Sequence, residues 1–192
     1  MNKKELQKSM KFSLSIAVIT FVLAAIFSVV SSSILSGVMS IVGLVIVFII
    51  VFIGVVFDML GIAATAADEV PFHAMAAEKV TGSKQAIKIV RNADRFASFC
   101  NDVIGDISGI ISGTASAIVV LQIANGFGYG EGTTFHLVIN VVLTSLVAAL
   151  TVGGKALGKF LGINSSTNII FFVAKIIAFL EEKFKIRVLP NK

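Results

Sequence analysis

Long apolar runs alternate with short polar segments along this chain, and this pattern predicts helices that cross a membrane. A bilayer core about 30 Å thick needs roughly 20 helical residues to span it. Four runs reach that length: 12–35, 38–67, approximately 99–124 and approximately 134–154. A fifth run, 168–180, is shorter and contains Lys175, so it predicts an interfacial helix or one packed under the others.

Composition supports the same class of protein. Of 192 residues, 56% are hydrophobic and only 14% are charged, and the mean hydropathy is +0.97, whereas soluble domains are about a quarter charged. The first run is longer than the apolar part of a signal peptide and lacks a clear cleavage site, so we interpret it as a span. The net charge of +5 is then explained by basic residues that set the orientation of the spans and contact anionic lipid, rather than by binding to nucleic acid.

The basic residues predict the orientation of the spans, because cytoplasmic loops carry an excess of Lys and Arg. All sixteen Lys and Arg residues precede the first run, lie between the second and third, or follow the fourth. The connections at 36–37 and 125–133 contain none. Both termini and the segment 68–98 are therefore predicted to be cytoplasmic. This predicts an all-α integral membrane protein with four transmembrane helices, in a cytoplasmic membrane of the bacterial type.

The segment 68–98 has the pattern of a helical hairpin on the inner leaflet. Pro71 follows two acidic residues, as at a helix start, and apolar positions then recur at helical spacing until the break at 81–83. A second apolar stretch follows with basic residues opposite. Small residues also recur at intervals of four in the third and fourth runs, which predicts close helix packing at Gly105, Gly109, Gly113, Gly154 and Gly158.

Carboxylates inside the spans are the candidate chemistry. Asp58, Asp102 and Asp106 all fall in the cytoplasmic half of the predicted bundle, as does Lys155. An aspartate at the centre of a span costs about 2.5–3.5 kcal/mol on insertion scales, and oxygen ligands suit Mg²⁺. Three interpretations follow: an ion pathway, a buried pair of Asp58 or Asp106 with Lys155, or placement of Asp58 and Asp102 at the headgroup boundary.

Enzymatic motifs are missing from the sequence. The single Cys100 excludes an internal disulfide, and no H-E-x-x-H, P-loop, Ser/His/Asp spacing or redox cysteine pair occurs. The expectation is therefore a protein that is not an enzyme and holds no organic cofactor.

The order of these features resembles the transmembrane domain of the CorC/cyclin-M (CNNM) magnesium transporters. The hairpin "MAAEKVTGSKQAIKIVRNADRFASF" (75–99) is similar to the family's hairpin and its following Asn/Pro-Asp-Arg step. "GDISGI" (105–110) looks like the family's Gly-Asn turn, and "GKALGK" (154–159) looks like its "GEIVPK". "GIAATAA" (61–67) stands where the family has a Ser-Glu-Thr-Ala break, which leaves Thr65 as the nearest hydroxyl.

The resemblance implies a three-span domain over 38–185, with the hairpin at 68–98 and a juxtamembrane helix at 168–180. Residues 1–37 would add an N-terminal segment and a further span, and 186–192 would form a tail. It also implies a homodimer and Mg²⁺ as the favoured ion, with Na⁺ or H⁺ as a driving ion. The candidate metal ligands are Asp106, Asp102, Asp58 and Thr65.

Two departures from the family pattern bear on function. Lys155 stands where the family has a metal-binding glutamate, and an ammonium repels Mg²⁺ or takes its place. We expect no counterpart of the family's regulatory nucleotide-binding domains here, which leaves a separate regulatory protein open as a partner. The hypothesis is a small cation transporter or transporter-like protein in lipid. The alternative is a non-transporting adaptor whose basic hairpin contacts a partner protein or anionic lipid.

Overall fold

The computed structural model describes residues 3–129 and 132–184, so the predicted tail at 186–192 lies outside the described residues. Within these ranges the chain is helical and contains no strand. The elements are α1 (Lys3–Ser36), α2 (Ser40–Ala66), α3 (Val70–Ala77), α4 (Ser83–Arg91), α5 (Ala93–Ser98), the π-helix η1 (Phe99–Gly105), α6 (Asp106–Gly126), α7 (Thr134–Asn164) and α8 (Ser166–Phe184).

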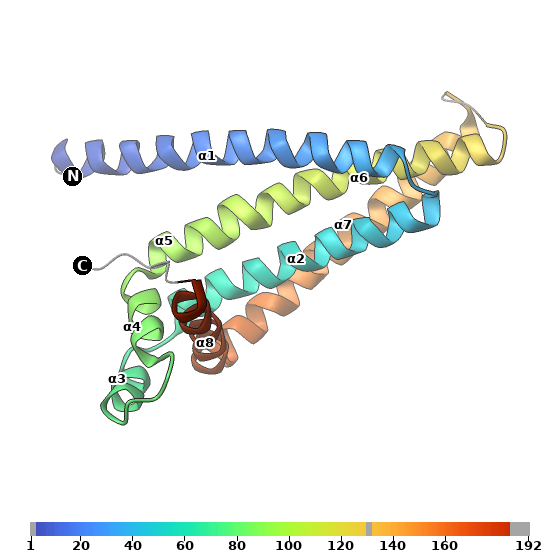
Figure 1. Cartoon of the computed structure of the whole chain (residues 1–192). Helices are drawn as coiled ribbons and strands as arrows, with labels where there is room; N and C mark the ends of the chain where they lie inside the picture. Colours follow the sequence, from blue (N-terminus) through green and yellow to red (C-terminus); the bar gives the residue numbers. More distant parts are fainter. Residues whose placement is uncertain (1–2, 130–131, 185–192) are drawn as a thin grey trace. The chain divides into compact units, whose positions relative to one another are not determined.

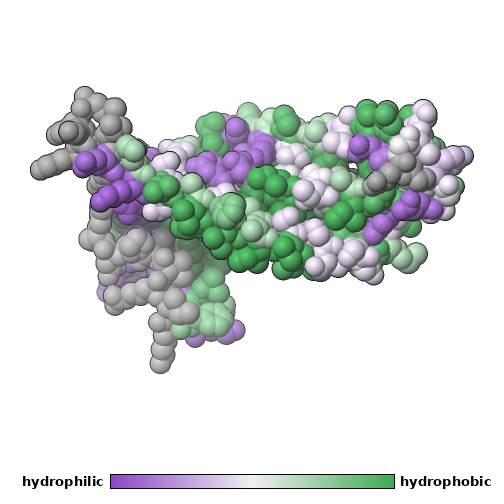
Figure 2. All heavy atoms as spheres, turned by 90° about the horizontal axis from the view of Figure 1, so that it is seen from above, coloured by the Kyte–Doolittle hydropathy of each residue, from purple (hydrophilic) through white to green (hydrophobic). Residues whose placement is uncertain are grey.

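Four helical segments are long and apolar enough to cross a membrane, which indicates an integral membrane protein. They are Met10–Ser36, Ser40–Ala66, Ala93–Gly126 and Thr134–Asn164, so all four predicted spans are found. Their outward side chains are largely apolar: on α1, Leu14, Phe21 and Val29 are each about two-thirds exposed or more. Much of the face seen in Figure 2 is accordingly coloured as hydrophobic.

The chain divides into two compact units, and α2 and α7 each contribute to both. The first unit joins Met1–Val55 to Val103–Gly154, and the second joins Val56–Asp102 to Lys155–Lys192. Within the first unit, α1 packs along α6 (Figure 1).

The first unit is held by apolar packing between its long helices. One buried cluster draws on the end of α1, on α2, on α6 and on α7: Leu35, Val47, Val51, Ala115, Val119 and Val147. Gln122 Nε2 donates a 2.7 Å hydrogen bond to the carbonyl oxygen of Leu35, which satisfies an orphan carbonyl at the end of α1. Gly54 allows α2 to approach α6, because a Cβ there would lie 2.8 Å from the Cβ of Ser108.

The second unit packs the hairpin α3–α4 against α8. Its core is a cluster of buried side chains from the end of α2, from the hairpin and from α8: Ala63, Ala64, Phe72, Ala86, Ile89, Ile170 and Ala174. Burying a side chain such as the fully buried Phe72 contributes about 1.5–3 kcal/mol. Gly82 forms the turn before α4 with φ +94°, where a Cβ would lie 3.0 Å from the backbone nitrogen of Lys175. Both constraints require glycine here.

The predicted hairpin is confirmed as two helices, and Pro71 lies in the first turn of α3 as expected. Several boundaries differ from prediction, because a helix can continue through polar residues beyond the apolar run that predicted it. The third span begins at Ala93 rather than near Phe99, the fourth continues to Asn164, and the short fifth run becomes the 19-residue α8.

The glycines predicted to pack helices differ in their surroundings within the chain. Gly105 and Gly158 are buried, and a Cβ at Gly154 would lie 2.9 Å from Val55 Cγ2. A Cβ at Gly109 or Gly113 would meet no atom within 4 Å. The buried small residues of α6 are instead Ser108, Ser112, Ala115, Ser116 and Ala124.

Candidate functional site

Asp58 is a buried carboxylate within a membrane-spanning helix. The residue is 6% exposed, and Oδ1 lies 3.8 Å from Nζ of Lys155 on α7. That separation is an ion pair but is longer than a hydrogen bond, which for N–H···O is about 2.7–3.2 Å. The structure thus joins Asp58 and Lys155, one of the pairs that the sequence suggested.

Close packing of α2 and α7 brings the pair together in the second unit. A Cβ at Gly162 would lie 2.9 Å from the backbone oxygen of Met59 and 3.4 Å from the backbone nitrogen of Ala63. Without a side chain at Gly162, the two helix backbones can pack directly on one another, as small residues allow in membranes.

Two buried oxygens in this region lack a hydrogen-bond partner: Asp58 Oδ2 and Asn101 Oδ1. Asn101 lies on the π-helix and rests on Gly61 of α2, where a Cβ would lie only 2.6 Å from Asn101 Cγ. Gly61 follows Asp58 by three residues, so both positions are on one face of α2. The amide and the carboxylate therefore approach the same side of this helix.

The π-helix determines where Asn101 lies. In Phe99–Gly105 the backbone bonds span five residues instead of four, which widens the turn and shifts side chains around the axis. Cys100 and Val103 are buried, while Asp102 is exposed. Such local widening is frequent at functional sites.

The other predicted ligands, Asp102, Asp106 and Thr65, are exposed, whereas Asp58 is buried. Asp102 and Asp106 are exposed on the chain, and Asp106 belongs to the first unit whereas Asp58 and Asp102 belong to the second. Thr65 is exposed, and its hydroxyl donates to the carbonyl of Ile62 at 2.9 Å. Within residues 3–129 and 132–184, no three His, Cys, Asp or Glu side chains are grouped closely enough to hold a metal ion.

Sequence reasoning missed Asn101, although it lies within the third predicted span. An amide inside an apolar run was the available signal, since polar side chains in spans are costly and commonly functional. The contact of Asn101 with Gly61 depends on packing between segments that are distant in the sequence, so no local sequence pattern predicts it.

A second polar cluster joins the two hairpin helices. Glu69 Oε1 accepts hydrogen bonds from Arg91 Nε at 2.5 Å and from His73 Nε2 at 2.7 Å. The hydrogen bond to His73 and the nearby Arg91 guanidinium lower the pKa of Glu69 below its ordinary value, against a smaller opposing effect of desolvation. The cluster is exposed and ties α3 to α4.

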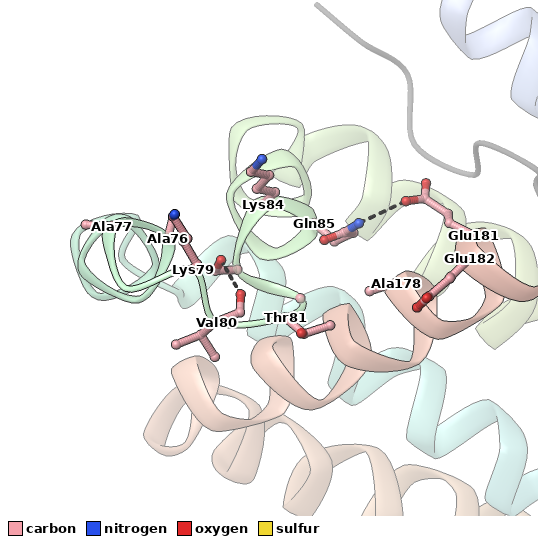
Figure 3. A pocket seen from close by; sticks show the side chains of 12 residues that line it. Ala76, Ala77, Lys79, Val80, Thr81, Lys84, Gln85, Ala178, Glu181 and Glu182 are labelled. Atoms are coloured by element: carbon pink, nitrogen blue, oxygen red, sulfur yellow. Dashed lines mark hydrogen bonds between the residues drawn. The ribbon is translucent and has the colours of Figure 1, made fainter.

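An open groove of about 920 Å³ lies between the hairpin and α8. Figure 3 shows side chains of both charges around it, with Lys79 and Lys84 from the hairpin region and Glu181 and Glu182 from α8. Gln85 Nε2 donates to Glu181 Oε2 at 3.0 Å across one side. The groove is lined by charged donors and acceptors and by small apolar side chains such as Ala76 and Val80.

No protein-family model matches the chain, and no curated protein or solved structure matches it either. The resemblance to the CorC/cyclin-M transporters therefore stays a prediction from the motifs quoted above.

Proposed function

We propose that this chain is a small membrane cation transporter or transporter-like protein that works as a homodimer. Mg²⁺ is the favoured ion by resemblance, and the carboxylates Asp58, Asp102 and Asp106, with Thr65, are the candidate ligands in an inward-facing site. Both termini and the hairpin would lie on the cytoplasmic side.

The observation that supports this proposal is the buried Asp58. A carboxylate is expensive within a membrane span and is ordinarily kept for an ion, a proton or a partner. Here one oxygen faces Lys155 at 3.8 Å and the other has no hydrogen-bond partner. A carboxylate held only for structure would be expected to use both oxygens.

The exposed carboxylates support a homodimer. Asp102 and Asp106 lie on the surface of the single chain, inside the segment Ala93–Gly126 that is long enough to span. Contact with lipid at the centre of a span would cost each of them about 2.5–3.5 kcal/mol. A second copy that encloses a wet polar cavity along this helix would remove that cost.

The test is thermal stability of the detergent-purified protein in Mg²⁺, Ca²⁺, Mn²⁺ and Na⁺. We would measure the fraction that stays monodisperse on size exclusion after heating, for the wild type and for Asp58→Asn and Asp106→Asn. Glu78→Gln is the matched control, because Glu78 is exposed in the hairpin. A ligand at a hundred times its Kd stabilises the folded state by about 2.7 kcal/mol.

Saturable stabilisation by one ion that either aspartate variant loses and Glu78→Gln keeps would support the proposal. Flux of the same ion into liposomes would then test whether the bound ion is also transported. Well-folded protein that responds to no ion contradicts a cation site.

The second candidate function is a non-transporting membrane adaptor, and the position of Lys155 favours it. An ammonium beside Asp58 supplies internally the charge that a transported cation would bring. The charged groove of the second unit would then serve the partner. Liposome flux separates the two functions: an adaptor gives none in the wild type, and Lys155→Met does not create it.

A further inference from the structure

We propose that Asp58 Oδ2 and Asn101 Oδ1 are two ligands of one buried site for a small monovalent cation, seated on the Gly61 face of α2. The inference rests on the proposed transport function and names the charge class of the ion at this end of the site. It also assigns a role to Asn101, which the motifs did not suggest.

Helical spacing places Asp58 and Gly61 on one face of α2, and Asn101 contacts that face at Gly61. The Asn101 amide lies directly over Gly61, and Cβ positions three residues apart on a helix are about 5–6 Å from one another. Hard cations bind oxygen at roughly 2.0–2.6 Å, so one ion can join two oxygens up to about 5 Å apart. The spacing of Asp58 and Gly61 is compatible with that span.

Burial shows that the two oxygens need a positively charged or donating partner. Both oxygen atoms are inaccessible and have no hydrogen-bond partner, and each such group costs about 1–3 kcal/mol when left unmet. A carboxylate oxygen and an amide oxygen can only accept. Both oxygens can therefore act as ligands of a cation.

The charge of the site favours a monovalent ion. Asp58 brings one negative charge, and Lys155 Nζ lies 3.8 Å from its other oxygen. No cage of three acidic, His or Cys side chains exists in the described part of the chain to offset a divalent ion. Mg²⁺ also loses its water reluctantly, whereas a monovalent ion asks less of a site with one carboxylate.

Lys155 sets how strongly the ion is held. Its ammonium competes for Asp58 through Oδ1 but is too distant for a hydrogen bond, which leaves Oδ2 available. Removing that charge should therefore tighten cation binding rather than abolish it. This direction is opposite to the one expected if Lys155 only stabilised the fold.

The experiment measures the melting of full-length detergent-purified protein in NaCl, LiCl and KCl, with choline chloride at equal ionic strength as the reference. Three variants are compared with the wild type: Asn101→Leu, Asn101→Asp and Lys155→Met. Gln122→Leu is the matched control, because Gln122 is another amide of the same span with an unpartnered buried oxygen, and it lies in the first unit.

The expected result is saturable stabilisation by one alkali cation over choline. Asn101→Leu should raise the apparent Kd about tenfold or more, since even the residues that merely support metal ligands change affinity by about 10–100-fold. Gln122→Leu should keep the wild-type Kd, Asn101→Asp should keep or lower it, and Lys155→Met should lower it.

Three outcomes would overturn the inference. Equal melting in all alkali chlorides and choline would mean that water alone fills the space between the oxygens. An alkali-cation response that Asn101→Leu leaves intact would place the ion elsewhere. A response to Mg²⁺ alone, lost in Asp58→Asn but kept in Asn101→Leu, would also reject this site while leaving the proposed transport function standing.

Discussion

Lys155 Nζ lies 3.8 Å from Oδ1 of Asp58, and the two residues come from helices that are both long and apolar enough to span a membrane. The Asp58 side chain is 9% exposed and that of Lys155 is 24% exposed. The pair is therefore protected on the carboxylate side and more open on the ammonium side. This asymmetry lets Lys155 move away from Asp58 at a smaller cost than Asp58 could move from Lys155.

A double-mutant cycle on this pair should show favourable coupling. Asp58→Asn and Lys155→Met each leave one charge without its partner, so the two losses in unfolding free energy should sum to more than the loss in the double variant. Coupling between contacting residues is typically about 0.5–3 kcal/mol. The measurement is unfolding by SDS in mixed micelles.

The control for that cycle is Lys159→Met, which removes an exposed charge one helical turn further along α7. Combined with Asp58→Asn it should be additive within about 0.3–0.5 kcal/mol. Coupling as large as that of Lys155 would show that general electrostatics, rather than the pair, produces the effect.

Acidification should weaken the hairpin through Glu69. Its folded pKa is lowered by His73 and Arg91, so its contribution to stability is present above the unfolded pKa, about 4.3. That contribution is lost as pH falls from there through the folded pKa. We expect Glu69→Gln to melt at a lower temperature than the wild type at neutral pH and to converge with it in acid.

The matched control for the pH series is Glu78→Gln, which also removes an exposed carboxylate from the hairpin region. It should leave the difference between neutral and acidic melting temperatures as in the wild type. A Glu69→Gln variant with the full acid sensitivity of the wild type would assign the effect to another group.

Hydrophobic patterning was sufficient to predict the four spans and the hairpin. Spans are specified by composition over about 20 residues, and the hairpin by Pro71 and the break at Gly82, all of which are local signals. The ends were less predictable because α7 continues through Lys155 and Lys159 to Asn164. Long side chains of this kind can reach water from within a helix.

The site was only partly predictable, because it depends on contacts between distant segments. Asp58 and Lys155 stand out in the sequence as charges in apolar runs, so they could be proposed as partners. The π-helix at Phe99–Gly105 has no periodicity of its own to reveal it. Asn101 therefore became visible only when its amide was found against Gly61.

Alanine substitution should separate the packing glycines from the open ones. Gly162→Ala would place a Cβ 2.9 Å from a backbone oxygen of α2, which cannot give way as a flexible side chain can. Overpacking of this kind costs about 1–3 kcal/mol. Gly113→Ala meets nothing within 4 Å in the chain, and alanine favours the helix by up to about 1 kcal/mol.

Both alanine variants can be compared by SDS unfolding and by their elution volume on size exclusion. We expect Gly162→Ala to unfold at lower SDS with unchanged oligomeric state. Gly113→Ala should unfold at equal or higher SDS if its face is free. Loss of a dimer peak in Gly113→Ala alone would instead show that this open face of α6 contacts the second copy.

Cysteine labelling in spheroplasts should reveal the orientation of the spans. In a Cys100→Ala background, Thr81→Cys lies in the exposed turn between α3 and α4, and Asn125→Cys lies exposed near the end of α6. The distribution of Lys and Arg predicts that the first position faces the cytoplasm and the second faces outward. A membrane-impermeant maleimide should therefore label Asn125→Cys in intact cells and label Thr81→Cys only after lysis. The reverse pattern would contradict the predicted topology and would put the hairpin, the groove and the Asp58 end of the helices on the outer side.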